Sequence, residues 1–288
     1  MSTSSLISRA RSVAFQGEPG AYAHLAAREA LPEIRAMPCP TFDDAVEAVR
    51  TGTADLSIIP VENSLHGRIA DIHHLLPNAG LYIVGEHFHR VRHQLLGLKG
   101  ASVANLKTVF SQGPALGQCR KIIRELKLSP HHWHDTAGSA RHVAELGDPT
   151  ASAIASSLAA EIYGLDVIRT DVEDEPHNMT RFLIMAHEPD DAPNDGASVI
   201  TTFVFRVRNV PAALYKALGG FATNGVNMTK LESYQLGGSF NATQFYADIE
   251  GHPEERNVRL ALEELQFFTS KLTVLGVYPA HPFRNEMP

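Results

Sequence analysis

Residues 12–31 read SVAFQGEPGAYAHLAAREAL, and this stretch indicates the fold. Its first five residues have the apolar, β-forming character of a buried strand. From Gly20 onward the apolar residues have the spacing of an amphipathic helix. A short strand that leads into a helix is the repeating unit of α/β proteins, so this class is the prediction for the chain.

The same order recurs as far as about residue 190. Each further β-rich run is followed by a stretch with helical spacing, which supports the α/β assignment. The pairs are 55–61 with a predicted helix over 64–76, 107–112 with 113–128, 131–135 with 136–147, and 152–156 with 157–165. The helix predicted over 42–50 is the best marked, because Thr41 can cap it and Gly52 follows its end.

A different order begins after the stretch PDDAPNDGAS at 189–198, whose Pro, Gly and Asp content is typical of a linker. We place a domain boundary at 191–197. Beyond it the pattern predicts strand, helix, strand, strand, helix and strand, which is the βαββαβ order of ferredoxin-like domains. The predicted elements cover 199–208, 211–225, 227–236, 240–251, 253–269 and 271–279.

Composition narrows the class of protein. The 288 residues carry 25 Lys and Arg against 32 Asp and Glu, a formal charge of -7, without the basic block of a nucleic-acid binder. Cys39 and Cys119 form no paired framework, which is typical of a reduced compartment. No apolar run approaches the roughly 18 residues of a membrane span, nor does the start resemble a signal peptide. We therefore expect a cytoplasmic protein with neither nucleic acid nor membrane as partner.

Small polar residues follow the predicted strands of the first 190 residues. The junctions read QGEPGAYAH, VENS, SQGPALGQ, DTAGSA and SS. In α/β proteins, ligands bind beyond the carboxyl ends of the strands, where helix N-termini offer free N–H groups. Gly17 and Gly20 fit no nucleotide-binding fingerprint. These junctions therefore predict a site for a small anionic organic acid held by amides and hydroxyls.

These motifs resemble prephenate dehydratase over nearly the whole chain. The resemblance rests on GEPGAY near the start, PVENS at 60–64, ALGQC at 115–119, DTAGSA at 135–140 and TRF at 180–182, and residues 198–284 resemble an ACT domain. It implies a catalytic region at 1–190 with two α/β lobes, similar to type II periplasmic binding proteins. One lobe would comprise 12–88 with 170–190, and the other 89–169.

The resemblance also implies the site residues and the ligands. The substrate would be prephenate and no cofactor would be required. L-phenylalanine would bind as effector at ACT domains paired in a homodimer or homotetramer. The implied residues are catalytic Thr180, Asn63, Gln118, Ser111 and Glu62, substrate-binding Ser64, Thr136, Ala137, Ser139, Arg181 and Phe182, and effector-binding Ala212, Ala213, Leu214, Asn227, Glu232 and Ser233.

The chain departs from the family pattern at four places. Ala23 follows Tyr22 where a hydroxyl is usual, and QGP at 112–114 replaces a His-Pro-Gln type of segment. In the ACT half, Ala212 stands where glycine is expected, and ESYQ at 232–235 replaces ESRP.

The chemistry assigns a role to Thr180. Prephenate loses carbon dioxide and its ring hydroxyl, so the departing oxygen must receive a proton or a strong hydrogen bond. Because side chains alternate along a strand, Thr180 and Phe182 would face the cleft while Arg181 faces away, bound to Glu173, Asp174 or Glu175. Asn63, Ser111 and Gln118 would orient the substrate, Glu62 would orient Asn63 or a water, and the helix start at 136–139 would receive a carboxylate.

Other readings stay open. His87 and His89 alternate on a predicted strand, yet they lack an HExxH pattern or a Cys partner, so we expect surface histidines and no metal site. Without the resemblance, Thr180 would be taken as a strand-end residue that satisfies the backbone. The sequence equally permits arogenate as substrate. A non-catalytic sensor of amino or organic acids is the rival from another class.

Overall fold

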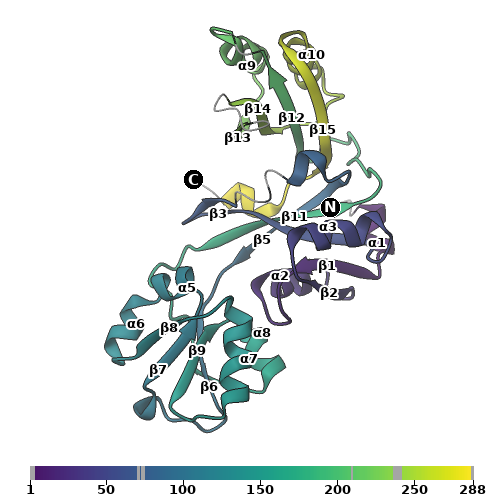
Figure 1. Ribbon diagram of the computed structural model, residues 1–288. Helices are drawn as coiled ribbons and strands as arrows, with labels where there is room; N and C mark the ends of the chain where they lie inside the picture. Colours follow the sequence, from purple (N-terminus) through teal and green to yellow (C-terminus); the bar gives the residue numbers. More distant parts are fainter. Residues whose placement is uncertain (1–3, 70–71, 73–74, 209, 236–241, 287–288) are drawn as a thin grey trace.

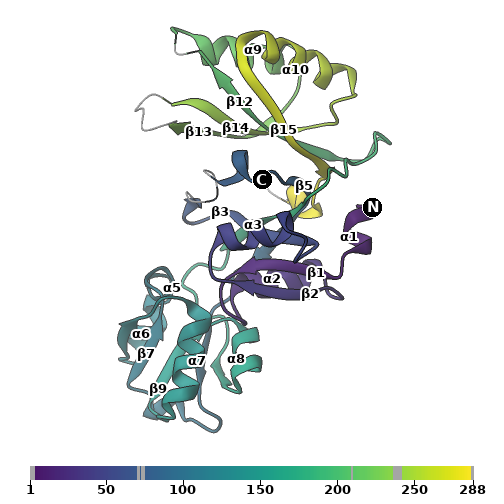
Figure 2. The same cartoon turned by 45° about the vertical axis from the view of Figure 1, so that its right-hand side comes forward.

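The structure is a computed structural model that describes residues 4–69, 72, 75–208, 210–235 and 242–286. Three β-sheets with their helices follow one another along the long direction of the molecule (Figure 1). The first sheet lies in the middle, the second at one end and the third at the other. Figure 2 shows the same order after a turn of the molecule.

The first sheet has the strand order β2-β1-β3-β11-β5, with β4 paired to β3. Strand β1 is parallel to β2 and β3, whereas β11 is antiparallel to β3 and β5, so the sheet is mixed. Its strands are β1 (Ser12–Gln16), β2 (Arg35–Cys39), β3 (Leu56–Asn63), β4 (Gly67–Arg68), β5 (Tyr82–Arg90) and β11 (Met179–Ala186), and its helices are α1 (Ser5–Arg9), α2 (Tyr22–Ala30), α3 (Phe42–Arg50) and η1 (Leu76–Asn78).

Two helices predicted from the sequence can be compared with the structure around the first sheet. Thr41 caps α3 as expected, since its hydroxyl accepts from the Asp44 N–H in a capping box. The helix predicted over 64–76 is wrong in its first part, because Gly67–Arg68 turns back and pairs with the end of β3. Residues 70, 71, 73 and 74 of that prediction lie outside the described residues.

The second sheet has the order β10-β6-β9-β7-β8. The helix predicted over 113–128 is divided at Cys119, because the Asp174 carboxylate accepts from the N–H groups of Arg120 and Lys121 and so caps a new helix. The elements are β6 (Gln94–Gly97), β7 (Thr108–Ser111), β8 (Ser129–His132), β9 (Ala151–Ala155), β10 (Asp166–Arg169), η2 (Val103–Asn105), α5 (Gly113–Gln118), α6 (Arg120–Glu125), α7 (Thr136–Leu146) and α8 (Ser157–Tyr163).

The third sheet has the order β13-β14-β12-β15, and its chain order is βαββαβ. Helices α9 and α10 cover one face, where Phe203, Phe221 and Leu265 are buried. The elements are β12 (Val199–Val207), α9 (Ala213–Thr223), β13 (Met228–Gln235), β14 (Ala242–Glu250), α10 (Arg256–Phe268), β15 (Thr269–Pro279) and η3 (Pro282–Glu286).

The other face of the third sheet packs on the first sheet. Tyr246 and Tyr278 share a buried cluster with Ile83 and Leu183. Gly276 is required at this contact, because a Cβ there would lie 2.1 Å from the carbonyl oxygen of Ile83. The two sheets are therefore joined by a close-packed core and not by a linker alone.

Two connections join the first and second sheets. The chain leaves β5 through residues 91–93 and returns through 170–178 into β11 (Figure 1). The connections lie side by side, since the Val172 N–H donates to the His93 carbonyl and the Val91 N–H to that of Asn178. They bring the ends of β3 and β11 next to α5. In the part of the chain that the structure describes, no helix has the length and apolar character needed to span a bilayer.

Candidate active site

A cavity of about 380 Å³ lies between the first and second sheets. Its wall on the first sheet includes Asn63, Thr180 and Phe182, and its opposite wall includes Gln118 and Thr136. These residues are far apart in the sequence and come from both predicted lobes. A larger cavity of about 610 Å³ lies on the other side of β3 and β11, against the third sheet.

Asn63 and Thr180 are cross-strand neighbours in the register of β3 and β11. The Asn63 Nδ2 group donates to Thr180 Oγ1 at 3.0 Å and to Asn178 Oδ1 at 2.6 Å. Its Oδ1 accepts from the N–H groups of Leu65 and His66, which fixes the orientation of the amide. Since Thr180 Oγ1 accepts from Asn63, its own proton is free to point toward a ligand.

Gln118 closes the cavity from the second sheet. Its Oε1 lies 2.7 Å from His93 Nε2 and 3.1 Å from Asn178 Nδ2, and its Nε2 lies 2.6 Å from His66 Nε2. The other ring nitrogen of His93, Nδ1, extends this set of hydrogen bonds, because it lies 2.6 Å from the Tyr22 hydroxyl. Hydrogen bonds therefore connect the two walls of the cavity in one network from Thr180 through Asn178 and Gln118 to Tyr22.

The cavity contains more titratable groups than the sequence led us to expect. Tyr22, His66, His93 and Asp135 all line it, beside the predicted amides and hydroxyls. Burial raises the pKa of Tyr22 well above its ordinary value and lowers the pKa of His93, so both are held neutral. Tyr22 belongs to the GEPGAY motif and could have been selected, whereas His93 and Asn178 lie in the connections and carried no motif of their own.

Several predicted site residues lie outside the cavity. Ser111 is fully buried and its hydroxyl donates to the Ile154 carbonyl at 2.7 Å, so it supports the scaffold and does not orient a substrate. The Ser64 hydroxyl donates to the His177 carbonyl and accepts from the Met179 N–H. Both hydroxyls are used by the backbone at strand ends.

The start of α7 is only in part available to an anion. Thr136 lines the cavity, but Ala137 and Ser139 are fully buried. Asp135 caps this helix itself, with its carboxylate 2.7 Å from the Gly138 N–H. Two of the four N–H groups in the predicted carboxylate site over 136–139 are therefore engaged within the protein, those of Gly138 and Ser139.

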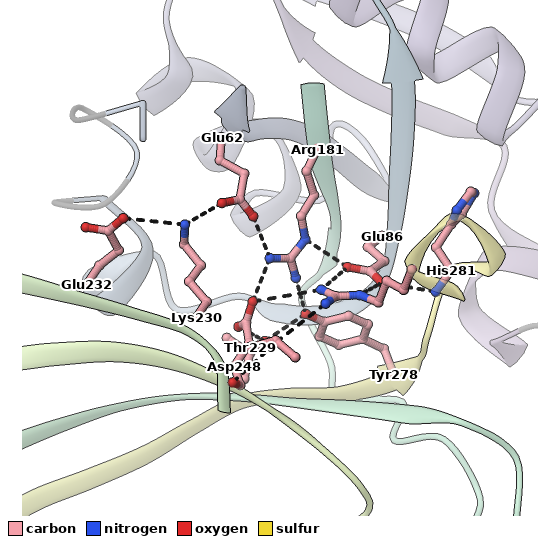
Figure 3. Close-up of polar contacts among 11 residues, drawn as sticks. Glu62, Glu86, Arg181, Thr229, Lys230, Glu232, Asp248, Tyr278 and His281 are labelled. Atoms are coloured by element: carbon pink, nitrogen blue, oxygen red, sulfur yellow. Dashed lines mark hydrogen bonds and ion pairs between the residues drawn. The ribbon is translucent and has the colours of Figure 1, made fainter. Parts of the chain in front are cut away.

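Arg181 faces away from the cavity, as alternation along the strand requires, but its predicted partners are wrong (Figure 3). Its guanidinium donates to Glu86 at 2.8 Å, to Asp248 at 2.6 Å and to Glu62 at 2.9 Å. It also donates to the Tyr278 hydroxyl. The guanidinium is 3% exposed, and its hydrogen bonds go to protein groups on the face of the sheet away from the cavity. Two of the acidic residues predicted to bind Arg181 have other partners. Glu173 accepts a hydrogen bond from the His93 N–H, and Asp174 caps α6.

Glu62, like Arg181, lies on the face of the first sheet that points away from the cavity. Its carboxylate binds Arg181 and Lys230, whereas the sequence predicted that it would orient Asn63 or a water. Burial raises its pKa, but the two cations outweigh that effect and lower the pKa to about 2. Glu62 is therefore an anion that joins β3 to β13 across the boundary between the sheets.

Two of the predicted effector residues lie at the same boundary. Glu232 forms ion pairs with Arg68 and Lys230, both at 3.6 Å. The Ser233 carbonyl accepts from Arg68 at 3.2 Å. Arg68 belongs to the short strand β4 of the first sheet. These contacts connect β13 with the first sheet.

The other four predicted effector residues lie around α9 and β13. Ala213 and Leu214 form the first turn of α9, and Asn227 donates to Glu250. Ala212 precedes the helix with φ of 61° and ψ of 14°, in the left-handed region. This conformation explains why the family pattern has glycine at this position.

One group of side chains among the described residues has the composition of a metal site. Glu29 of α2 and His87 and His89 of β5 bring their ligand atoms within 4.8 Å of one another. His89 is buried and His87 half-buried, so the expectation of surface histidines is wrong for this pair. In the structure the histidines hydrogen-bond to Glu29 Oε2, at 2.7 Å from His89 and 3.2 Å from His87.

Fold and site together define an α/β protein with a polar cleft between two sheets and a threonine at the end of a strand, and comparison with known proteins gives the family. The prephenate dehydratase family model matches residues 13–190, and the chain belongs to this family. A relative from Komagataeibacter europaeus, described as a bifunctional N-acyl-homoserine lactone acylase/prephenate dehydratase, is 53% identical over 96% of this chain and 98% of its own.

Two further relatives extend the comparison. Arogenate dehydratase/prephenate dehydratase 2 from Arabidopsis thaliana is 40% identical and covers 93% of this chain and 72% of its own. The solved structure of prephenate dehydratase in complex with L-Phe from Arthrobacter aurescens has a TM-score of 0.84 and 28% identity, covering 94% of both chains.

Proposed function

We propose that this protein converts prephenate to phenylpyruvate, carbon dioxide and water. The observation that carries the proposal is the position of Thr180, whose hydroxyl lies in the cleft beside Asn63 at 3.0 Å with its proton undirected by the protein. Membership of the family supports the reaction class. Within the described residues, the cleft is lined by amide, hydroxyl, imidazole and apolar groups with Asp135, and neither a cysteine nor a lysine lines it.

The geometry gives each group a task. Loss of the ring carboxylate as carbon dioxide leaves an electron pair that expels the ring hydroxyl. Thr180 donates a hydrogen bond to that oxygen as the C–O bond breaks, and Phe182 forms the wall against the ring. Asn63 orients the Thr180 hydroxyl from one wall, and Gln118 forms part of the opposite wall. Because a threonine hydroxyl is a weak acid, it transfers a proton only if a neighbour replaces it.

We further propose a regulatory role for the third sheet. Residues 1–190 would be the catalytic domain with lobes 12–88 plus 170–190 and 89–169, residues 191–197 a linker, and residues 198–284 an ACT domain that binds L-phenylalanine and pairs in a dimer or tetramer. The Arthrobacter aurescens relative, solved with L-Phe, supports the choice of effector. The ion pairs of Glu62 and Arg181 with β13 and β14 offer a physical connection between effector domain and cleft.

An ultraviolet assay of the purified protein with prephenate and arogenate, side by side, tests the function. We expect phenylpyruvate from prephenate, and added L-phenylalanine should reduce the rate and shift the sedimentation coefficient. Faster turnover of arogenate would replace the proposed substrate. Ligand binding with no turnover of either compound would identify a sensor instead of an enzyme. No change in rate or sedimentation with L-phenylalanine would remove the regulatory proposal.

A second activity is proposed on one observation, the 53% identity to the relative described as a bifunctional acylase/prephenate dehydratase. Hydrolysis of an N-acyl-homoserine lactone would be followed by mass spectrometry of the released fatty acid. Release of fatty acid above the level of boiled enzyme is the expected result, and its absence would restrict the protein to the dehydratase reaction.

A further inference from the structure

Three side chains of metal-binding types meet between α2 and β5. Glu29 lies in the last turn of α2, whereas His87 and His89 lie two residues apart on β5 and therefore on one face of the strand. Glu29 Oε2 is 2.7 Å from His89 Nδ1 and 3.2 Å from His87 Nε2. The ligand atoms of all three residues lie within 4.8 Å of one another, so each can reach a single ion placed between them.

The separations between these atoms suit a transition-metal ion. Zn²⁺ binds imidazole nitrogens and carboxylate oxygens at about 2.0–2.2 Å, so neighbouring ligand atoms of a tetrahedral site are roughly 3.2–3.6 Å apart. The distances of 2.7 and 3.2 Å from the carboxylate to the two rings are at or slightly below this range. Small side-chain rotations would therefore open the group around an ion. Two histidines, one carboxylate and a water are a known ligand set of open zinc sites.

The fold fixes two of the ligands and exposes the third. The His89 side chain is 4% exposed and the His87 side chain 14%, whereas that of Glu29 is 44% exposed. Because the two rings are already held by packing, they lose little further freedom when they bind an ion. The exposed carboxylate gives a hydrated ion a route into the group and lets a water serve as the fourth ligand.

The surroundings of the group leave its ligand atoms available. In the part of the chain that the structure describes, the Glu29 carboxylate forms ion pairs only with the two histidines, and the neighbouring Arg28 is directed to Glu161 instead. The buried Nε2 of His89 lacks a protein partner among the described residues with or without an ion, so it favours neither form. An ion would thus replace the two hydrogen bonds and no other contact.

The other histidines and the cysteines offer no comparable group. Cys39 and Cys119 are both buried. His131, His132 and His134 are close together in the sequence and exposed, but within the described ranges they are not gathered with further ligand atoms. Metal binding by the folded protein can therefore be attributed to one place.

We propose that Glu29, His87 and His89 bind a divalent transition-metal ion, with Zn²⁺ as the favoured ion and a water as its fourth ligand. Imidazole ligands select Zn²⁺ over Mg²⁺ and Ca²⁺, which prefer oxygen ligands. The ion joins the end of α2 to β5, the edge strand of the first sheet. No step of the proposed dehydratase reaction uses this ion, so the site adds to that function and does not depend on it.

The test uses the full chain, freed of metal by a chelator and dialysis. Calorimetric titration with Zn²⁺ should show one ion per chain with a micromolar or tighter dissociation constant, and Zn²⁺ should raise the midpoint of thermal unfolding. Glu29→Gln should weaken binding at least about 100-fold, the upper value for loss of a second-shell contact, and should remove the thermal shift. An amide keeps the hydrogen bonds to the two rings but is a poor zinc ligand. His87→Gln should have the same effect.

His134→Gln is the matched control, because His134 is exposed and lies outside the group. It should bind Zn²⁺ as the wild type does. Co²⁺ gives an independent measure of the geometry, since a tetrahedral site produces an intense visible absorption that Glu29→Gln should lack. Circular dichroism of the metal-free variants verifies folding, and if one ligand variant is disturbed the other decides.

Two results would overturn the site. No uptake of Zn²⁺, or equal affinity in the wild type and Glu29→Gln, would show that hydrogen bonds alone hold the three side chains together. Equal weakening in His134→Gln would indicate adventitious binding to surface histidines.

Discussion

Arg181 Nη1 lies 2.6 Å from Asp248 Oδ2, and this contact joins the strand that carries Thr180 to the third sheet. Thr180 and Arg181 are consecutive residues of β11, so their side chains point to opposite faces. Thr180 faces the cleft, and Arg181 faces the boundary with the third sheet. A displacement of β14 would therefore act on β11 directly beside the candidate catalytic hydroxyl.

Replacing Thr180 with valine should abolish most of the activity. The change keeps the shape of the side chain but removes the hydroxyl, and we expect kcat to fall roughly 10²- to 10⁴-fold. Folding should be nearly unaffected, because the Asn63 amide keeps Asn178 and the Met179 carbonyl as acceptors. Steady-state assays and circular dichroism make the comparison, and a folded variant with near wild-type turnover would remove Thr180 from the mechanism.

Replacing Arg181 with leucine should destabilise the protein by roughly 3–5 kcal/mol, since Glu86 and Asp248 would be left without the central cation. Both of these carboxylate side chains are fully buried. Urea denaturation measures the change. Arg28→Ala is the control, because the ion pair of Arg28 with Glu161 is exposed and should contribute about 0–1 kcal/mol. A similar loss in both variants would show that the buried position is unimportant.

Stability should fall in acid through Glu62. Its pKa of about 2 in the folded protein lies below the ordinary 4.5, so the unfolded chain takes up the proton first as the pH falls. The stabilisation is thus complete above about pH 4.5 and is lost toward pH 2. Unfolding free energies of wild type and Glu62→Gln, measured from pH 6 to pH 3, should converge on acidification. A difference that stays constant with pH would contradict the assignment.

Replacing Ala212 with glycine should stabilise the protein at the start of α9. A left-handed conformation costs a residue with a Cβ atom about 1–2 kcal/mol, part of which glycine loses again through its more flexible unfolded state. We expect a gain of about 0.5–1 kcal/mol in the unfolding free energy, measured by urea denaturation. Ala213→Gly is the control, because Ala213 is the first residue of α9 with an ordinary helical conformation and should lose up to about 1 kcal/mol. A loss of stability in Ala212→Gly would show that the alanine is not strained.

The sequence predicted which residues line the cavity better than it predicted which groups each side chain contacts. Alternation along a strand correctly separated Thr180 from Arg181, and motif residues Asn63, Gln118, Thr136 and Phe182 all reached the cavity. The partners of Arg181 were missed, because they come from β5, β3, β14 and β15 and pair only after the sheets have packed. Ser111 and Ser64 were assigned to substrate, since a sequence does not show which hydroxyls the backbone will use.

Local patterns in the chain determined the strands, the capped helix at Thr41 and the change of order after residue 190, because these depend on neighbours within a few residues. Only the tertiary structure decided that Asn63, Gln118 and Thr180 line one cavity, that His89 stands opposite Thr180 in the first sheet, and that a buried arginine joins the first and third sheets. Strand register and sheet packing set these contacts between residues more than fifty positions apart, and no short stretch of sequence encodes them.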